Sequence, residues 1–332
     1  HVELNLDIVG GRPNWDVVNG GRDILWFSER DGWGHLYRFG PDGDLKNRIT
    51  QGPWTFGELL HVDESTDRVI FTARGREAGQ IPMFRKLYSV GIDGSGLALI
   101  GAEDGDHAVR VTPDGQYLVD AYSRPDVPPV SVLRDTSGRA VMELECADLA
   151  ALEAIGWSPP RIFEYKGRDG ITTIYGLMHL PSDFDSTTVY PVVEYVYPGP
   201  FIGSVGTWNF GGGPLGLVVR ADQDALAELG FAVLQMDHMG TSLRSKAMLD
   251  HYWGNMGDNG IPDHVAALRQ LGARHGFLDL DRVGIYGHSG GGFASTGAIL
   301  RYPDIYKVAV SSSGNHDNRS YHAAYAEKYQ GL

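Results

Sequence analysis

Short runs of alternating hydrophobic and polar residues fill roughly the first 145 positions of the chain. Their β-branched and aromatic content is typical of strands, at 24–27, 35–39, 68–72, 86–90 and 117–119. Between them lie Asp-Gly pairs, at 31–32, 42–43, 93–94 and 114–115. Such pairs supply the positive-φ residues that tight hairpins need. The pattern therefore predicts an all-β region of short antiparallel strands.

One of these runs is repeated along the chain. Residues 35–39 and the Asp-Gly pair after them match residues 86–90 and their Asp-Gly pair, and 130–133 form a weaker third copy. A repeat of roughly 40–50 residues with about four strands is typical of β-propeller blades. A β-sandwich with similar turns is the alternative. Because propellers need about four to eight blades, we expect further blades outside this chain.

From about residue 147 the pattern changes to apolar strand-like runs that alternate with helical runs of about ten residues. Helices are expected at 147–155, 222–229, 263–271 and 292–301, and strands at 161–165, 171–180, 192–197, 231–236, 283–286 and 308–312. This alternation predicts a doubly wound, mostly parallel sheet with helices on its faces. We therefore expect two domains, 1–146 and 147–332.

Composition limits the classes of partner that the protein can be expected to bind. The net charge is −14 over 332 residues, which disfavours nucleic acid and anionic membrane surfaces. The sequence contains no apolar run near the roughly 18 residues of a membrane-spanning helix. A single cysteine, Cys146, excludes an internal disulfide framework and a multi-cysteine metal site. The sequence does not distinguish a periplasmic from a cytoplasmic location. We expect the true N-terminus of the protein upstream of His1.

The strongest chemical signal is the pentapeptide 287–291, Gly-His-Ser-Gly-Gly, which fits G-x-S-x-G. It directly follows the expected strand and directly precedes the small-residue helix, which is where a nucleophile elbow must lie. Ser289 is therefore the candidate nucleophile, and the N–H of Gly290 is a candidate oxyanion donor. A packing turn or a phosphate loop is the alternative, but no Gly-Lys-Ser/Thr follows. The other glycine-rich stretch, 211–213, is interpreted as a flexible loop.

Together these segments resemble the prolyl oligopeptidase family, in particular its dipeptidyl peptidase IV-like branch. Residues 27–33 and 35–37 are similar to a propeller segment of the family, and 111–117 are similar to another blade signature. Residues 190–193 and 196–200 resemble the strand that ends in Val-Tyr-x-Gly-Pro, and 252–257 with Asp263 resemble the stretch before the elbow. The resemblance implies propeller blades followed by an α/β-hydrolase catalytic domain.

The same resemblance implies roles for three tyrosines. Tyr197 occupies the position whose hydroxyl completes the oxyanion hole, while Tyr321 and Tyr325 match the segment that lines the substrate pocket. A tyrosine that merely packs at the strand end is the alternative for Tyr197. The chain departs from the family at 237–241, where Asp-His-Met-Gly-Thr replaces Asp-Gly-Arg-Gly-Ser, and at Gly290, where an aromatic residue is common. These changes leave the peptide preference open.

A hydrolase elbow also needs an acid and a base, in the chain order Ser, Asp, His. Asp304, Asp317, His316 and His322 follow Ser289, but they lie too early or on the pocket segment. We therefore expect the triad Asp and His beyond Leu332, and the chain alone to be inactive. The expected function is a serine peptidase, dipeptidyl or oligopeptidyl, that acts on short peptides without a cofactor or metal, with a homodimer allowed. A catalytically silent binding module and an esterase or acyl-amide hydrolase are the alternatives.

Overall fold

A computed structural model describes residues 15–199, 202–211, 221–321 and 323–330 of the chain. The chain divides into two compact units. The first contains His1–Asp148 with the short segments Trp208–Phe210 and Leu243–Ala247, and the second contains Leu149–Thr207, Gly211–Ser242 and Met248–Leu332. Some residues named in the sequence analysis lie outside the described residues: 212–213 of the glycine-rich stretch, Pro200, His322 and Leu332.

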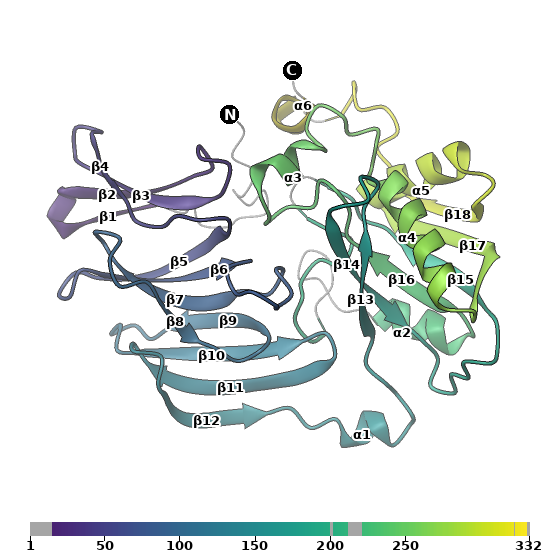
Figure 1. Cartoon of the computed structure of the whole chain (residues 1–332), viewed down its shortest axis with the longest axis horizontal. Coiled ribbons are helices and arrows are strands. Elements are labelled where there is room, and N and C mark those ends of the chain that lie inside the picture. The colour runs from purple at the N-terminus through teal and green to yellow at the C-terminus, as the bar shows by residue number, and fades with distance from the viewer. Residues whose placement is uncertain (1–14, 200–201, 212–220, 322, 331–332) are drawn as a thin grey trace. The chain divides into compact units, whose positions relative to one another are not determined.

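The first unit contains three antiparallel sheets of four strands each (Figure 1). The first sheet joins β1 (Trp15–Val18), β2 (Asp23–Ser28), β3 (His35–Phe39) and β4 (Leu45–Arg48), with a short 3-10 helix η1 (Asn19–Gly21) between β1 and β2. The second joins β5 (Thr55–Asp63), β6 (Arg68–Arg74), β7 (Lys86–Gly91) and β8 (Ala98–Gly101). The third joins β9 (Asp106–Val111), β10 (Tyr117–Arg124), β11 (Val127–Asp135) and β12 (Ala140–Cys146).

The sequence repeat falls on one strand of each sheet. The strands β3, β7 and β11 contain the three copies, and each is the third strand of its sheet. Each sheet is a simple up-and-down meander of consecutive strands, as in a propeller blade, whereas a sandwich of this type would link two sheets by Greek-key crossings. The prediction of propeller blades is therefore confirmed, and the sandwich alternative is wrong.

An aromatic stack forms the centre of the first unit's larger core. Trp54 follows β4, and its ring centroid lies 6.3 Å from those of both Phe71 on β6 and Tyr88 on β7. Phe56 on β5 stacks on Phe71 at 4.9 Å. All four side chains are buried. The ring of Trp54 also lies 5.0 Å from that of His35 on β3, and Phe56 lies 6.3 Å from Phe27 on β2, so the aromatic cluster joins two successive blades.

The second unit is built on one six-stranded sheet, in the order β13-β14-β16-β15-β17-β18. Its strands are β13 (Arg161–Lys166), β14 (Thr173–His179), β15 (Tyr190–Tyr195), β16 (Ala232–Met236), β17 (Leu278–His288) and β18 (Tyr306–Ser312). The strands β16, β15, β17 and β18 run parallel, and β13 and β14 pair antiparallel at one edge. The prediction of a mostly parallel sheet is therefore confirmed.

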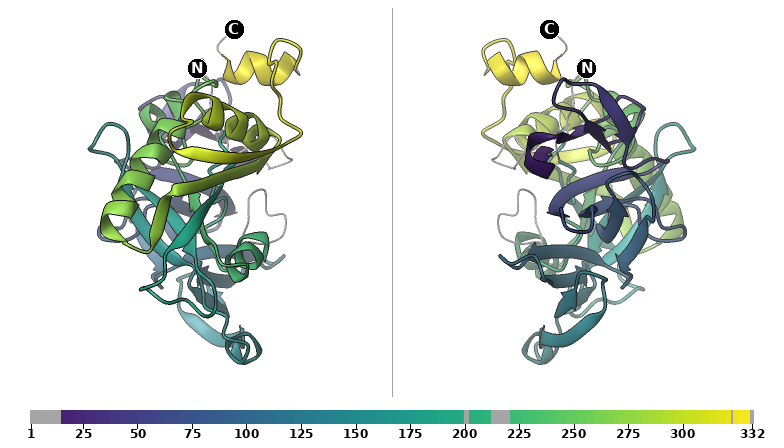
Figure 2. Two further views of the ribbon diagram at one scale, coloured as in Figure 1. Left: turned by 90° about the vertical axis from the view of Figure 1, so that its right-hand side faces the viewer. Right: turned by 90° about the vertical axis from the view of Figure 1, so that its left-hand side faces the viewer.

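Helices cover both faces of this sheet. The helices α4 (Ile261–Arg274) and α5 (Gly290–Arg301) share one hydrophobic core with Leu234 and Ile285, and α5 packs on β17 and β18 (Figure 2). The next residue along each strand points to the other face. There Gln223 and Asp222 of α2 (Ala221–Glu228) contact the hydroxyl of Tyr286. The sheet is therefore doubly wound, as the sequence predicts.

Three short helices differ from the sequence prediction. The helix expected at 147–155 is only one turn, α1 (Ala150–Glu153), and its residues are exposed. Without a buried face, a segment this short has little to stabilise a longer helix. Two helices were not predicted, α3 (Lys246–Asp250) and α6 (Ala323–Tyr329). Among the residues described, none of the helices combines the length and apolar character that a membrane crossing requires.

Candidate active site

Ser289 lies on a strained turn between β17 and α5. Its backbone has φ 55° and ψ −117°, a conformation that costs a non-glycine residue about 1–3 kcal/mol. Two hydrogen bonds hold the turn: the Ser289 N–H donates to the carbonyl of Ser312 at 2.8 Å, and the Phe293 N–H donates to the Ser289 carbonyl at 3.1 Å. The structure therefore places Ser289 at a strand-turn-helix junction with the geometry of a nucleophile elbow.

Two glycines allow the chain segments around the elbow to approach closely. A Cβ atom on Gly291 would overlap the carbonyl oxygen of Val196, and one on Gly287 would lie 2.6 Å from the carbonyl carbon of Gly291. Gly290 differs, because a Cβ there would meet only the carbonyl oxygen of Pro198, at 3.3 Å. The elbow therefore requires glycine at 287 and 291, whereas position 290 has room for a side chain.

Gly290 is the first residue of α5, so its N–H has no acceptor within the helix. The helix has 12 residues, and the aligned peptide dipoles give its N-terminus a partial positive charge of about half a unit. Both effects favour an anion beside Ser289. The backbone at Gly290 can therefore donate to the oxygen that becomes negative when a serine attacks a carbonyl.

Tyr197 lies at the same edge of the sheet as the elbow. The parallel pairing of β15 with β17 matches Tyr195 to Tyr286, and the Val196 N–H continues it by donating to the Tyr286 carbonyl at 3.0 Å. The next residue, Tyr197, is half-buried where the chain leaves the sheet. The structure thus brings the backbones of Tyr197 and Gly291 together at the carboxyl edge, where ligands of open α/β sheets bind.

The predicted pocket tyrosines form a cluster that includes Tyr197. The ring centroids of Tyr321 and Tyr325 are 5.2 Å apart, and those of Tyr325 and Tyr329 are 5.0 Å apart, both edge to face. Burial raises the pKa of Tyr325, and the nearby hydroxyls of Tyr321, Tyr329 and Tyr197 raise it further. Burial likewise raises the pKa of Tyr252, with smaller contributions from Tyr325 and Tyr197. Tyr197 therefore lies within electrostatic reach of this cluster.

The histidines next to the elbow have other partners. His288 directs Nδ1 to the hydroxyl of Ser312 at 3.0 Å, and the exposed His316 has Nε2 3.5 Å from that of Ser311. Asp317 pairs with Arg319 at 2.9 Å. Within residues 15–199, 202–211, 221–321 and 323–330, no histidine nitrogen hydrogen-bonds to the Ser289 hydroxyl. In the described part of the chain, the candidate nucleophile Ser289 therefore has no histidine beside it that could act as a base.

The sequence does not predict a role for two buried residues near the backbone of Tyr197, Ser204 and Asp237. The hydroxyl of Ser204 accepts a hydrogen bond from the Tyr197 N–H at 3.1 Å, and the Asp237 carboxylate accepts one from the Val205 N–H at 3.1 Å. Asp237 was noted only as part of a family-like motif, and Ser204 had no signal at all. A side chain that accepts a backbone N–H in an irregular loop leaves no periodic trace in the sequence.

The first unit contains one group of side chains with the spacing of metal ligands, among the residues described: Glu103, His107 and Asp120. Arg134 already pairs with two of them, at 2.6 Å to Glu103 and 2.8 Å to Asp120. Although burial opposes the charge on Asp120, hydrogen bonds from His107 and Arg134 hold its pKa below the usual range. This arrangement is that of a structural ion network.

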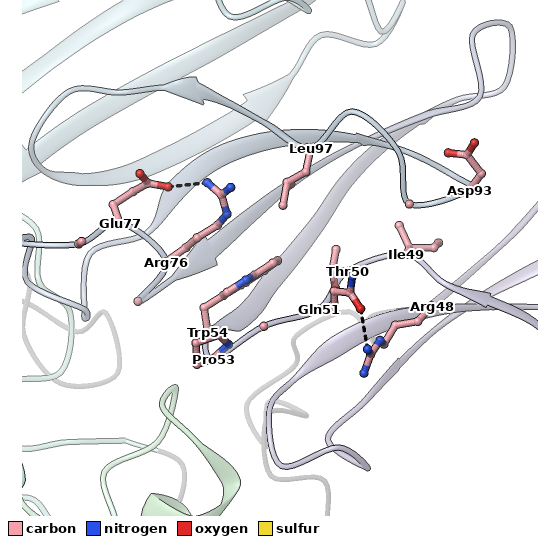
Figure 3. A pocket seen from close by; sticks show the side chains of 14 residues that line it. Arg48, Ile49, Thr50, Gln51, Pro53, Trp54, Arg76, Glu77, Asp93 and Leu97 are labelled. Atoms are coloured by element: carbon pink, nitrogen blue, oxygen red, sulfur yellow. Dashed lines mark hydrogen bonds and ion pairs between the residues drawn. The ribbon is translucent and has the colours of Figure 1, made fainter.

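The first unit also contains a cavity of about 800 Å³ that shares no residue with the elbow (Figure 3). Trp54 forms part of its wall, and both arginines on the wall have hydrogen-bond partners there. Arg76 pairs with Glu77 at 2.8 Å, and Arg48 donates to Gln51 at 2.6 Å. Asp93 also lies on the wall, where it accepts the Ser95 N–H at 2.8 Å, and these contacts give no indication of a reaction.

Comparison with known proteins agrees with this geometry. The profile of the prolyl oligopeptidase family matches residues 218–332, and that of the dipeptidyl peptidase IV (DPP IV) N-terminal region matches residues 12–129. The chain is 28% identical to human dipeptidyl peptidase 8 over 295 residues, which covers 85% of this chain and 32% of the relative. It is 24% identical to dipeptidyl peptidase 4 of Trichophyton equinum over 318 residues, which covers 94% and 40%.

Solved structures show the same likeness. A putative dipeptidyl aminopeptidase IV from Bacteroides ovatus superimposes with a TM-score of 0.80 at 26% identity, which covers 93% of this chain and 45% of the other. Dipeptidyl peptidase 4 of Porphyromonas gingivalis shares the fold, with a TM-score of 0.81 at 23% identity, covering 96% and 43%. The chain thus spans less than half the length of these relatives. The two profile matches, the blades and the serine elbow together support a protein of the prolyl oligopeptidase family, similar to its dipeptidyl peptidase IV-like branch.

Proposed function

We propose that the protein is a serine peptidase that cleaves short peptides, releasing dipeptides or small oligopeptides, through an acyl-enzyme on Ser289. The observation that carries the proposal is the backbone of Ser289, held at φ 55° between a strand and the N-terminus of α5. Such strain in a non-glycine residue persists only where the surrounding structure imposes it. Relatives named dipeptidyl peptidases support the choice of peptides as substrates.

In the proposed mechanism the Ser289 Oγ attacks the peptide carbonyl carbon while its proton passes to a histidine. The carbonyl oxygen becomes negative and accepts hydrogen bonds from the Gly290 N–H and the Tyr197 hydroxyl. Collapse breaks the C–N bond, and the histidine gives the proton to the leaving amine. Water then hydrolyses the ester by the same steps. The histidine and its orienting aspartate come from a part of the protein outside this chain, and Tyr321 and Tyr325 line the substrate pocket.

Labelling of the full-length protein with a fluorophosphonate tests the nucleophile. We expect Ser289 to be labelled, and Ser289→Ala to abolish labelling and to lower kcat by about 10⁶ as in a comparable triad. Ser137→Ala, at an exposed turn of the first unit, is the control and should change neither. A folded Ser289→Ala variant that still reacts would refute the assignment, and wild-type protein that never reacts would favour a silent binding module.

Substrate choice is tested with chromogenic amides. A dipeptidyl peptidase should cleave a dipeptide p-nitroanilide with a free amino terminus and reject the N-acetylated form. Equal cleavage of both would indicate an oligopeptidase, and cleavage of simple esters alone would indicate an esterase.

We also propose that the propeller part ends near residue 146 and that the catalytic part begins at 147. A homodimer remains part of the proposal, and light scattering coupled to size-exclusion chromatography tests it.

A further inference from the structure

We propose that Ser204 is a positioning residue that fixes the orientation of Tyr197 as an oxyanion donor, and that Asp237 holds Ser204 in place. The inference rests on the proposed function, because it concerns the geometry of the same reaction. Neither residue touches the reacting atoms. Both act through the backbone of the loop that follows β15.

The first step is the contact between Ser204 and Tyr197. The backbone N–H of Tyr197 donates to the Ser204 Oγ at 3.1 Å, across a loop in which Gly199 and Ile202 form an isolated antiparallel bridge. Ser204 is fully buried. Loss of this acceptor would leave the half-buried Tyr197 N–H without its partner, so the hydrogen bond constrains the backbone from which the Tyr197 side chain extends.

The second step is the anchoring of Ser204 itself. Asp237, just beyond β16, accepts a hydrogen bond from the Val205 N–H at 3.1 Å. Its carboxylate lies so close to Gly203 that a Cβ there would overlap it. Asp237 is only 3% exposed. The loop is thus pinned on both sides of Ser204 to the end of the neighbouring strand.

The third step is the extension of this network into the sheet. Gln235 donates from Nε2 to the Ser204 carbonyl at 3.4 Å, and its Oε1 lies 3.2 Å from Nε2 of His179. His179 in turn contacts Asp224 of α2 at 2.5 Å. Gln235 and His179 are both buried. The backbone of Tyr197 is therefore tied, through Ser204, to two adjacent strands and a helix.

Rigid support of this kind matters for an oxyanion donor. The hydrogen bond must be aimed where charge develops in the transition state, and a displacement of about 1 Å can cost about a hundredfold in rate. Binding of the uncharged substrate is far less sensitive to the same displacement. A loss of positioning should therefore lower kcat and leave KM nearly unchanged.

The test is a double-mutant cycle in the full-length protein. We expect Ser204→Ala to lower kcat about tenfold with KM within about twofold, and Ser204→Thr, which keeps the hydroxyl, to recover most of it. In a Tyr197→Phe background, Ser204→Ala should change kcat by less than about twofold, because the donor is already gone. The control is Thr72→Val, which removes a buried hydroxyl that accepts the Glu58 N–H at 3.0 Å in the first unit and should leave kcat unchanged.

A second measurement does not depend on turnover. In protein labelled with 3-fluorotyrosine, the ¹⁹F resonance of Tyr197, assigned from Tyr197→Phe, should shift in Ser204→Ala and not in Thr72→Val. An unshifted resonance, or additive losses of kcat in the cycle, would overturn the positioning role. Absence of any hydrolysis by the wild type would instead overturn the proposed function, and the resonance would still decide the role of Ser204.

Discussion

Two buried aspartates from each unit illustrate two ways in which a buried carboxylate can stabilise a fold. In the first, Asp120 pairs with Arg134 across β10 and β11, and Asp23 pairs with Arg38 across β2 and β3, at 2.8 Å in each case. In the second, Asp237 and Asp263 accept backbone N–H groups from loops, those of Val205 and Met239, at 3.1 Å. A pair between side chains of neighbouring strands locks the register of a sheet. A carboxylate that binds backbone N–H groups instead sets the shape of an irregular loop.

The comparison shows where chemistry is possible on this fold. The strands of the blades repeat, and their buried charges pair with strands beside them. Among the described residues of the first unit, the cluster of Glu103, His107 and Asp120 is such an ion network. The elbow and the Tyr197 loop do not repeat, and their shapes depend on contacts between residues far apart in the sequence. Buried acids beneath such loops therefore mark the places where the fold specifies one arrangement of the backbone.

The largest expected effect separates two adjacent glycines of the elbow. Gly291→Ala should reduce fluorophosphonate labelling of the full-length protein at least about a hundredfold, because its Cβ would overlap the Val196 carbonyl and displace the nucleophile. The labelling rate of Gly290→Ala should stay within about threefold of the wild-type rate, because the Pro198 carbonyl needs to move only slightly. Labelling rates measured by mass spectrometry decide. Equal losses in the two variants would contradict the steric account of the elbow.

Two arginines that pair with buried aspartates sharpen the contrast between the units. Arg168 pairs with Asp263 at 2.7 Å and with Asp258, whereas Arg134 serves the blade network. Each Arg→Met change removes the guanidinium partner of a buried carboxylate, which keeps only its other hydrogen bonds, and should destabilise its unit by up to about 3–5 kcal/mol. Only Arg168→Met should also impair labelling of Ser289, because Asp263 holds the loop at Met239.

Hydrogen exchange in residues 117–135 and 261–274 measures the two losses of stability separately. The exposed pair of Arg319 and Asp317 supplies the control, since Arg319→Met should change stability by less than about 0.5 kcal/mol. If Arg134→Met impaired labelling as strongly as Arg168→Met, the proposed division between register and loop shape would fail.

Tyr197→Phe comes next in size. It keeps the ring in the tyrosine cluster and removes one donor, so kcat should fall about a hundred- to a thousandfold, or about 2.7–4 kcal/mol, with KM unchanged. Tyr321→Phe, in the same cluster but half-exposed, is the matched control and should act mainly on KM. Steady-state kinetics on a short proline-containing peptide measure both. A kcat within a few-fold of wild type for Tyr197→Phe would remove it from the mechanism.

The smallest effect is a pH dependence from a buried histidine of the second unit. Burial, together with the positive charge of the neighbouring His264, lowers the pKa of His238 to about 4. The unfolded chain then binds a proton below pH 6.5 that the folded protein refuses, so stability falls as the pH drops from 6.5 towards 4. At pH 5 the loss amounts to roughly 2 kcal/mol at most.

His264 has the opposite sign, because its pairing with Glu194 overcomes burial and raises its pKa, so its contribution is lost as the pH rises. The variant His238→Gln should therefore lose less stability than wild type between pH 7 and pH 5. Urea unfolding at the two pH values measures this difference. An equal loss in both proteins would show that His238 does not titrate in this range.

The sequence predicts the parts of the fold that depend on periodicity. The repeat at 35–39 and 86–90 falls on β3 and β7, which are buried inner strands and so keep the apolar positions that make them recognisable. The outer strands β4 and β12 bury none of their residues, and the sequence pattern does not predict them. In the site, Ser289 and Gly290 follow from a local pattern and Tyr197 from resemblance to a family. Ser204 depends on a fold of the loop that no local pattern encodes.

The hydrogen bond from the Ser289 N–H to the Ser312 carbonyl has a consequence for the order of synthesis. On the ribosome the serine emerges before the strand that accepts its N–H, so until β18 docks only one of the two hydrogen bonds that hold the strained backbone can form. A nascent chain therefore carries an unremarkable serine hydroxyl. Under the proposed function, we therefore expect the strained conformation of the serine to be complete only when the sheet has grown past it, and incompletely synthesised copies to be unreactive towards peptides.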